Sequence, residues 1–306
     1  MFKRSSGYPW FDTFFARKTM EKVPPHDLRG KVVVLSGATD GMGRVAADRF
    51  AEMGADLLVL GRNRGKTRNV VKELLDAGHP GNIESFYCDL SSLQSVRGAA
   101  EEVLGACDKI DFLINCAGIN NYERQNSVDG LEMNMAVNYF GSFLLVELLL
   151  PRMKVTPSSR IVNVTSAMQL YGHLNFDDLN VETDWSMFKA YAQAKLCMIM
   201  HTRDISHRFC DKNPKAVSLN PGFIHTNLLR DSSGLAGIFK LMSPYIAAPA
   251  WVGAERIILA ALDSTSNSGD YVYEDEVLLP NPEALDDQAV DELMKISRKV
   301  VLLDQT

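Results

Sequence analysis

From residue 31 onward, short apolar runs alternate with longer amphipathic stretches, and this alternation constrains the fold more than any other feature of the chain. The run KVVVLS at 31–36 is typical of a strand buried on both faces. Similar runs predict strands at 56–60, 83–88, 110–115, 161–165 and 216–219, with helices at about 42–53, 67–77, 92–107, 131–153 and 187–210. Such alternation requires a mostly parallel sheet with helices on both faces. We therefore predict one α/β domain of the doubly wound Rossmann type over 31–306, preceded by an N-terminal extension at 1–30.

Composition excludes several other classes of protein. Of 306 residues, 46% are hydrophobic and 23% are charged, which is ordinary for a globular protein. The net charge is −6, whereas a protein that binds the nucleic-acid backbone carries a basic surplus. The five cysteines form no Cys-x-x-Cys pair and the six histidines no His-Glu-x-x-His, so we expect neither a disulfide framework nor a metal site. Reduced cysteines fit a cytoplasmic protein.

The N-terminus raises the question of membrane contact. No run of 18 uninterrupted apolar residues predicts a transmembrane helix, and the N-terminus lacks the apolar core of a secretory signal. A helix over 10–20 would place Trp10, Phe11, Phe14 and Phe15 on one face. That face, within residues 8–15, either contacts a membrane interface or covers the core of the domain. Both alternatives stay open, and the second is the more common.

A glycine-rich turn, Ser36-Gly-Ala-Thr-Asp-Gly-Met-Gly43, joins the first predicted strand to the first helix. Glycines let backbone N–H groups approach a pyrophosphate, and the helix N-terminus adds a positive dipole. The position between strand and helix distinguishes this turn from an ordinary tight turn. The predicted dinucleotide contacts in it are Ser36, Gly37, Asp40, Gly41, Met42 and Gly43.

The end of the second strand bears on which dinucleotide is bound. A site for NAD carries a carboxylate there, whereas this chain has Arg62, Asn63 and Arg64. A guanidinium binds a 2′-phosphate through two parallel hydrogen bonds. NADP(H) is therefore favoured, with Arg62 and Asn63 as contacts. NAD(H) stays open, because Asp40 would repel a phosphate and the arginines can equally be solvated loop charges.

Tyr191 and Lys195 are four residues apart in a predicted helix, so both side chains lie on one face. A free tyrosine titrates near ~10, and an ammonium about 4 Å away favours the phenolate by at most ~4 kcal/mol. We therefore expect Lys195 to lower the pKa of Tyr191, against the opposing effect of desolvation. A tyrosine brought towards neutrality exchanges a proton with a carbonyl or alcohol oxygen.

Ser166 follows the predicted strand at 161–165. Its hydroxyl would point into the crevice where open α/β sheets bind ligands and would hold the substrate oxygen beside Tyr191. Thr165 is the competing hydroxyl, but alternation along a strand directs the two side chains to opposite faces.

Five segments resemble the short-chain dehydrogenase/reductase family, in the same order along residues 37–226. They are the glycine spacing, Asn115-Cys-Ala-Gly118, Asn138 within VNYFG, Tyr-x-x-x-Lys, and Asn220-Pro-Gly-Phe-Ile-His-Thr226. Ser36 and Cys116 stand where many members carry Thr and Asn. The resemblance implies catalytic roles for Ser166, Tyr191, Lys195 and Asn138, the last passing protons through water towards the lysine. It also implies cofactor contacts by Asp89, Leu90, Asn115, Ala117, Gly118, Tyr191, Lys195, Pro221, Gly222 and Thr226. In the family, the segment that resembles 220–226 covers the carboxamide of the nicotinamide.

The spacing between Ser166 and Tyr191 and the segment 268–286 are similar to those of retinol dehydrogenases and the WW-domain oxidoreductase group. This likeness implies an NADP(H)-dependent oxidoreductase that interconverts a lipophilic alcohol and carbonyl, of the retinoid, steroid or fatty aldehyde class. Substrate specificity is expected in the loops 167–186 and 224–250, with apolar lining from Tyr171, Phe176, Trp185, Phe223, Leu228, Phe239 and Trp251.

Two alternative functions remain open. One is a cofactor-binding regulatory protein without catalysis, and the other is a double-bond reductase on the same fold. A homodimer through helices 131–153 and 187–210 follows from the family's habit, although burial within one chain explains the same apolar residues.

Overall fold

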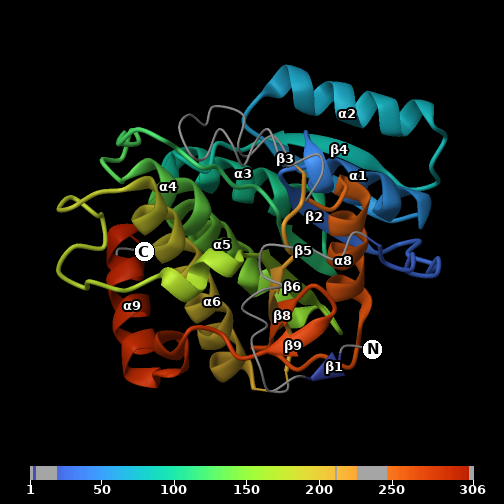
Figure 1. Cartoon of the computed structure of the whole chain (residues 1–306). Helices are drawn as coiled ribbons and strands as arrows, with labels where there is room; N and C mark the ends of the chain where they lie inside the picture. Colours follow the sequence, from blue (N-terminus) through green and yellow to red (C-terminus); the bar gives the residue numbers. More distant parts are fainter. Residues whose placement is uncertain (1–2, 5–18, 211, 226–246, 303–306) are drawn as a thin grey trace.

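The computed structural model describes residues 3–4, 19–210, 212–225 and 247–302. Within them, nine strands form one sheet in the order β1-β9-β8-β7-β6-β5-β2-β3-β4 (Figure 1). The strands are β1 (Lys3–Arg4), β2 (Val32–Ser36), β3 (Asp56–Gly61), β4 (Ile83–Tyr87), β5 (Phe112–Asn115), β6 (Arg160–Val164), β7 (Lys215–Asn220), β8 (Tyr271–Tyr273) and β9 (Glu276–Leu278). From β8 to β4 every neighbouring pair is parallel, while β8 and β9 form an antiparallel hairpin. The predicted doubly wound α/β fold is confirmed.

Successive strand residues pack on opposite faces of the sheet, which explains the continuous apolar runs. Val32 and Val34 belong to one buried cluster, and Val33 and Leu35 belong to another. The first cluster is covered by α3 (Leu93–Ala106), α5 (Gly141–Val155) and α6 (Met187–Phe209), and the second by α1 (Gly41–Glu52), α2 (Arg64–Asp76) and α8 (Ala250–Leu262). Burial on both sides leaves the strand ends as the places where polar side chains reach the solvent.

The chain order reverses between β5 and β3, which flank β2 on its two sides. In open α/β sheets, ligands bind outside the carboxyl ends of the strands at such a switch point. The fold therefore directs attention to the residues that follow β2, β5, β6 and β7.

A C-terminal helix, α9 (Asp287–Val300), packs beside α6 (Figure 1). The Tyr139 hydroxyl shares a hydrogen bond of 2.6 Å with the Ser297 hydroxyl of α9. The apolar residues of α5 and α6 are buried by elements of the same chain. Burial within the chain thus accounts for these apolar residues without a partner. The homodimer predicted through these helices stays a prediction.

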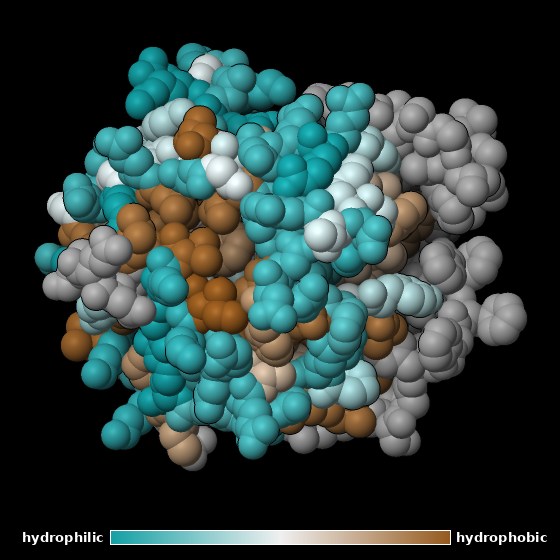
Figure 2. Space-filling model, turned by 90° about the vertical axis from the view of Figure 1, so that its left-hand side faces the viewer, coloured by the Kyte–Doolittle hydropathy of each residue, from teal (hydrophilic) through white to brown (hydrophobic). Residues whose placement is uncertain are grey.

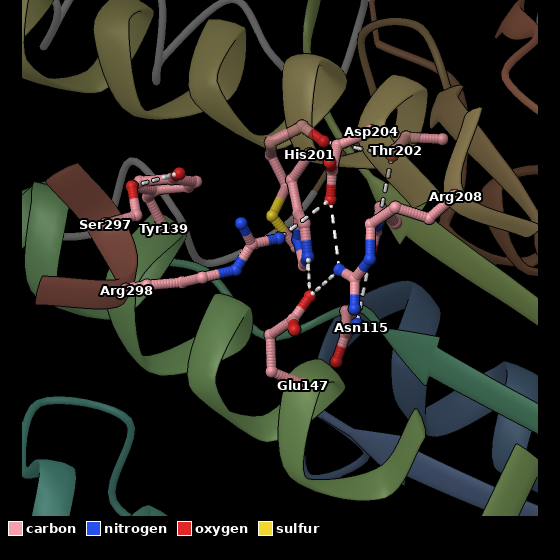
Figure 3. Close-up of polar contacts among 11 residues, drawn as sticks. Asn115, Tyr139, Glu147, His201, Thr202, Asp204, Arg208, Ser297 and Arg298 are labelled. Carbon is pink, nitrogen blue, oxygen red and sulfur yellow. Dashed lines mark hydrogen bonds and ion pairs between the residues drawn. The ribbon is translucent and has the colours of Figure 1, made fainter. Parts of the chain in front are cut away.

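A partly buried polar cluster joins α5, α6 and α9 (Figure 3). Arg208 Nη1 lies 2.6 Å from Glu147 Oε1 and 3.0 Å from Asp204 Oδ2, and His201 Nε2 lies 3.1 Å from Glu147 Oε1. Arg298 approaches Asp204 at 3.5 Å. Glu147, His201 and Asp204 are close enough together to suggest a metal site. Because Arg208 already bonds both carboxylates, we interpret the group as an ion-pair cluster.

One continuous helical stretch, Met133–Val155, is long and apolar enough to cross a membrane by length and composition. It comprises α4 (Met133–Met135), the π-helical η2 (Ala136–Phe140) and α5. Because 83% of its apolar window is buried inside the protein, we interpret it as a core helix.

The end of the predicted N-terminal extension packs on the domain. The Val23 amide donates to Glu255 Oε2 of α8 at 2.7 Å, and Arg49 Nη2 of α1 donates to the Val23 carbonyl at 3.0 Å. Val23 and Leu28 are buried. Residues 8–15 lie outside the described residues, so their contact with a membrane stays a prediction.

Candidate active site

The glycine turn lies between β2 and α1, as predicted. Gly37 has φ +82°, and a Cβ there would lie 2.6 Å from the Ala117 amide nitrogen. A Cβ on Gly43 would collide with the Gly37 carbonyl. Both glycines are therefore required by the close packing of the turn against the segment that follows β5. This packing places the N-terminus of α1 at the carboxyl edge of the sheet, where it favours an anion.

Three other residues of the turn have defined local roles. The Asp40 carboxylate caps α1 and accepts from the Gly41 amide at 2.7 Å. Ser36 Oγ donates to the Ile114 carbonyl at 3.5 Å and accepts from the Ala117 amide at 3.4 Å. Met42 packs between α8 and Ile224. These contacts hold the turn in place.

At the end of β3, Arg62 is exposed, and no hydrogen bond or ion pair of its side chain occurs among the described residues. Asn63 caps α2 by accepting from the Lys66 amide at 2.9 Å, and the Arg64 guanidinium stacks 4.3 Å from the centre of the Tyr87 ring. Of the two arginines at this strand end, Arg62 is therefore the one whose charge has no partner among the described residues.

The predicted cofactor residues at or after the ends of β4 and β5 contact other groups of the protein. The Asp89 carboxylate accepts from the amide and hydroxyl of Ser91, at 3.0 and 2.7 Å, and the Leu90 side chain is buried in the core. Asn115 Nδ2 donates to Asn163 Oδ1 at 2.8 Å, and Asn163 Nδ2 donates to Thr202 Oγ1 at 2.9 Å. The side chains of Leu90 and Asn115 thus point into the protein, and both residues are buried.

Ser166 and Tyr191 come together. Ser166 follows β6 and caps the short helix η3 (Ala167–Tyr171), and its hydroxyl hydrogen-bonds the Tyr191 phenol of α6. Thr165 is buried, and its Oγ1 has no hydrogen-bond partner among the described residues. Strand alternation thus selects Ser166 over Thr165, as expected from the sequence.

The pKa of Tyr191 shifts in the direction opposite to the prediction. Burial raises it to about 12, the bond from Ser166 lowers it and the nearby Tyr122 raises it. Burial also lowers the pKa of Lys195 to about 8. The expectation that Lys195 brings the tyrosine towards neutrality is wrong for this structure. Desolvation is the larger effect, and Lys195 Nζ donates to the Val164 carbonyl at 3.0 Å.

Asn138 lies in η2, where the helix is locally widened. Its Nδ2 donates to the Ile119 carbonyl at 2.9 Å and its Oδ1 accepts from the Ile119 amide at 3.0 Å. A Cβ on Gly118 would lie 3.0 Å from Asn138 Oδ1 and 3.6 Å from Lys195 Nζ. Gly118, Asn138 and Lys195 are therefore neighbours, and π-helical turns of this kind are frequent at functional sites.

The turn after β7 is supported by two residues that sequence reasoning missed. Arg256 Nη1 of α8 donates to the Pro221 carbonyl at 2.6 Å, and Arg256 pairs with Glu274 at 3.1 Å. The available signal was an arginine within the apolar helical pattern AERIILAAL. Thr226, predicted to complete this segment, lies outside the described residues.

The predicted apolar lining separates into three groups. Phe176 and Trp185 pack partly buried against the core, and Phe223 and Trp251 pack around Ile224. Tyr171 is exposed, while Leu228 and Phe239 lie outside the described residues. Figure 2 shows the side of the molecule that carries the loop 172–186, where hydrophobic residues gather in a hollow bordered by hydrophilic ones.

The short chain dehydrogenase family profile matches residues 31–234, about two thirds of the chain. The chain belongs to the short-chain dehydrogenase family. It is an oxidoreductase of that family, with an NAD(P)-binding Rossmann fold.

Similar proteins include two retinol dehydrogenases. Retinol dehydrogenase 13 of Homo sapiens is 31% identical over 287 residues, covering 90% of this chain and 86% of that protein. Retinol dehydrogenase 14 of Mus musculus is 33% identical over 299 residues, covering 90% and 87%. The predicted resemblance of this short-chain dehydrogenase to retinol dehydrogenases is therefore confirmed.

Solved structures agree on the fold of this short-chain dehydrogenase. A protein from Mycobacterium paratuberculosis superposes with a TM-score of 0.71 at 26% identity, covering 91% of this chain and 96% of that one. A short chain dehydrogenase from Burkholderia cenocepacia in complex with NADP superposes with a TM-score of 0.65 at 19% identity, covering 81% and 97%.

The residues of this short-chain dehydrogenase fit a dinucleotide cofactor. The glycine turn has no side chains at the two positions where its backbone packs most closely, and it opens a helix of 12 residues. A cation lies at the end of β3, and Tyr191 and Lys195 lie near the segment after β5. The helix N-terminus suits the central pyrophosphate of such a ligand, and the polar site beside Lys195 suits its nicotinamide half.

Proposed function

We propose that this short-chain dehydrogenase is an NADP(H)-dependent oxidoreductase that interconverts an alcohol and a carbonyl on a lipophilic substrate of the retinoid, steroid or fatty aldehyde class. The observation that carries the proposal is the hydrogen bond between Ser166 and the buried Tyr191, with Lys195 on the same helix. These side chains lie at or near the carboxyl end of β6, beside the turns expected to hold the cofactor.

Tyr191 is the proposed acid and base. With its pKa raised to about 12 by burial, it carries its proton at neutral pH and can donate it to a carbonyl oxygen. When bound, the nicotinamide supplies or accepts the hydride. Ser166 orients the substrate oxygen, and Lys195 places a positive charge near the phenol. Asn138 keeps the loop beside Lys195 in position and completes the proton relay.

The preference for NADP(H) rests on Arg62. Its guanidinium is exposed at the end of β3, where a 2′-phosphate would lie, and no carboxylate occupies that strand end. The structural relatives in complex with NADP are compatible with this choice. NAD(H) is the alternative, because the Asp40 carboxylate lies in the glycine turn.

The substrate class rests on relatives named retinol dehydrogenases and on the aromatic residues near the proposed site. Phe176 and Trp185 come from the loop after η3, and Phe223 and Trp251 border the second predicted substrate segment. An apolar lining with few polar groups suits a lipophilic molecule.

The test measures consumption of NADPH and NADH with retinal, steroid ketones and long-chain aldehydes. Tyr191→Phe should lower the rate by about 10²- to 10⁴-fold while it still binds the cofactor. Tyr139→Phe is the matched control, because Tyr139 is also a buried tyrosine and its hydroxyl bonds Ser297 of α9 instead of Ser166. Full turnover by Tyr191→Phe would refute the mechanism.

The same experiment separates the alternatives. An alcohol product supports the proposed reaction, whereas reduction of a carbon–carbon double bond identifies a double-bond reductase. Cofactor binding without turnover across the panel favours the regulatory protein.

A further inference from the structure

The turn Pro221-Gly222, which follows β7, is held from behind by two buried charges. Arg256 Nη1 donates to the Pro221 carbonyl at 2.6 Å. Arg256 Nη2 lies 3.1 Å from Glu274 Oε2, and each of the two residues is 2% exposed. Arg256 comes from α8 and Glu274 from the β8–β9 hairpin, so two separate elements meet at this turn.

The backbone of the turn is shaped to receive this pair. Gly222 has φ +75°, and a Cβ there would lie 2.7 Å from Glu274 Oε1 and 3.1 Å from Arg256 Nη1. Glu274 itself has φ +56°, which turns its amide to the Asn220 carbonyl at 2.8 Å. A side chain at 222 would displace the carboxylate, so the turn and the ion pair depend on each other.

Burying a charged pair is unfavourable in itself, because both ions lose their hydration. Well-packed apolar residues of similar volume often stabilise a protein equally well, so this pair is weak evidence of a role in stability alone. What apolar residues cannot supply is the charged donor to the Pro221 carbonyl.

We propose that Arg256 and Glu274 are a positioning pair that fixes the Pro221-Gly222 turn against the nicotinamide half of the cofactor. The inference rests on the proposed function and on the family resemblance, which implies that this segment covers the nicotinamide. Arg256 acts through the backbone of the turn and does not touch the reacting atoms.

A second buried arginine provides a matched control. Arg160, at the opposite end of the sheet where β6 begins, donates through Nη1 to the Ala260 carbonyl of α8 at 3.1 Å and to Ser266 Oγ at 2.8 Å. Both arginines tie α8 to its surroundings, but Arg160 lies at the amino end of its strand. Arg160→Met therefore reports the loss of a buried arginine without disturbance of the turn.

The experiment measures the affinity of the full chain for two ligands, without turnover. NADPH binding is followed by its fluorescence, and binding of adenosine 2′,5′-bisphosphate, which lacks the nicotinamide half, is followed by calorimetry. Arg256→Met should weaken NADPH binding by about tenfold or more, because a charged hydrogen bond that orders the turn is lost. Its affinity for adenosine 2′,5′-bisphosphate should not change.

Two further variants guard against misfolding. Glu274→Gln keeps the volume of the carboxylate, and Arg256→Met combined with Glu274→Leu leaves no unpaired charge. The double variant should unfold near the wild-type temperature, whereas Glu274→Gln should unfold at a lower one, because it leaves the buried Arg256 without its counter-charge. Both should show the same selective loss of NADPH affinity. Arg160→Met should affect the two ligands equally or not at all.

The outcomes are distinct. If the wild type binds both ligands and the folded variants keep wild-type NADPH affinity, or lose affinity for both ligands in parallel, the positioning role is wrong. If the wild type binds neither ligand, the proposed function itself fails and the inference falls with it.

Discussion

Lys195 Nζ lies 5.6 Å from the centre of the Tyr191 ring, yet it donates its hydrogen bond to the Val164 carbonyl. The ammonium is therefore bonded to the end of β6 and makes only a long contact with the face of the Tyr191 ring. Both side chains are buried, and burial favours the neutral form of each. It therefore raises the pKa of Tyr191 and lowers the pKa of Lys195.

Burial makes Lys195 a source of instability that the proposed catalytic role explains. Its pKa falls from 10.5 to about 8 on folding, which corresponds to at most about 3 kcal/mol. Because the folded state binds the proton more weakly, the penalty is full below pH 8 and disappears as the pH rises to 10.5. Lys195→Met should therefore unfold at a higher temperature at pH 7 and be inactive, with the stability difference smaller at pH 10.

The loss of the bond to Val164 offsets part of this gain, by about 1 kcal/mol. Lys189→Met, on the exposed surface of the same helix, is the control and should leave the unfolding temperature unchanged. A Lys195→Met variant less stable than the wild type at pH 7 would contradict the argument.

Glu147 makes the opposite contribution. Burial opposes its charge, but the bonds from His201 and Arg208 prevail and lower its pKa from 4.5 to about 2. Its stabilising effect, up to about 3 kcal/mol, is present above pH 4.5 and is lost as the pH falls towards 2. Glu147→Gln should lower the free energy of unfolding at pH 7 and approach the wild type in acid. Urea unfolding at pH 7 and pH 3 checks this, with exposed Glu101→Gln as control; an equal difference at both pH values would argue against it.

Arg62 should determine the choice of cofactor. Arg62→Ala should weaken NADPH binding by about 10- to 100-fold and leave NADH nearly unchanged, because a charged hydrogen bond to the 2′-phosphate is lost. Lys72→Ala removes an equal charge on α2, where Lys72 pairs with Asp76 on the surface, and should have little effect. Titration with both cofactors measures the ratio. Equal weakening of both would assign Arg62 to general attraction of the cofactor.

Asn281 should control the segment that carries Ser166. Its Nδ2 donates to the carbonyls of Gln169 at 3.0 Å and Gly172 at 2.9 Å, and its amide donates to Gln169 Oε1 at 2.9 Å. Asn281→Ala should cost about 1–3 kcal/mol in the free energy of unfolding, because buried acceptors lose their partner. It should also raise the KM of the substrate without changing NADPH affinity.

Asn267→Ala, in an exposed turn, is the control for this variant. An unchanged substrate KM would mean that the C-terminal turn supports stability only.

The fold was predictable from residues 31 to 220 because each strand and helix there has a periodic pattern of its own. The last third was not. β8 and β9 are three residues long, and their order depends on pairing with β7 and with each other. The sequence pattern also did not indicate α8 or α9. The position of α9 beside α6 is a long-range contact that no local pattern specifies.

At the proposed site, the neighbourhood of Ser166 and Tyr191 followed from a strand end and a helical spacing, both of which are local. The positions of Asn115 and Leu90 were also predictable, but the direction of their side chains was not. Asn115 turns into the sheet because Asn163 lies opposite it on β6, and that register arises only when the strands pair.

The sequence by itself determined the order of the elements, the glycine turn and the set of polar residues at the strand ends, because these depend on neighbours within a few residues. Only the tertiary structure decided how those residues are charged and supported. Desolvation of Tyr191 outweighs its lysine, and Arg256 and Glu274 reach the Pro221 turn from elements 35 residues or more further along the chain. Burial and long-range contact depend on every element packed around a side chain, so no local pattern specifies them.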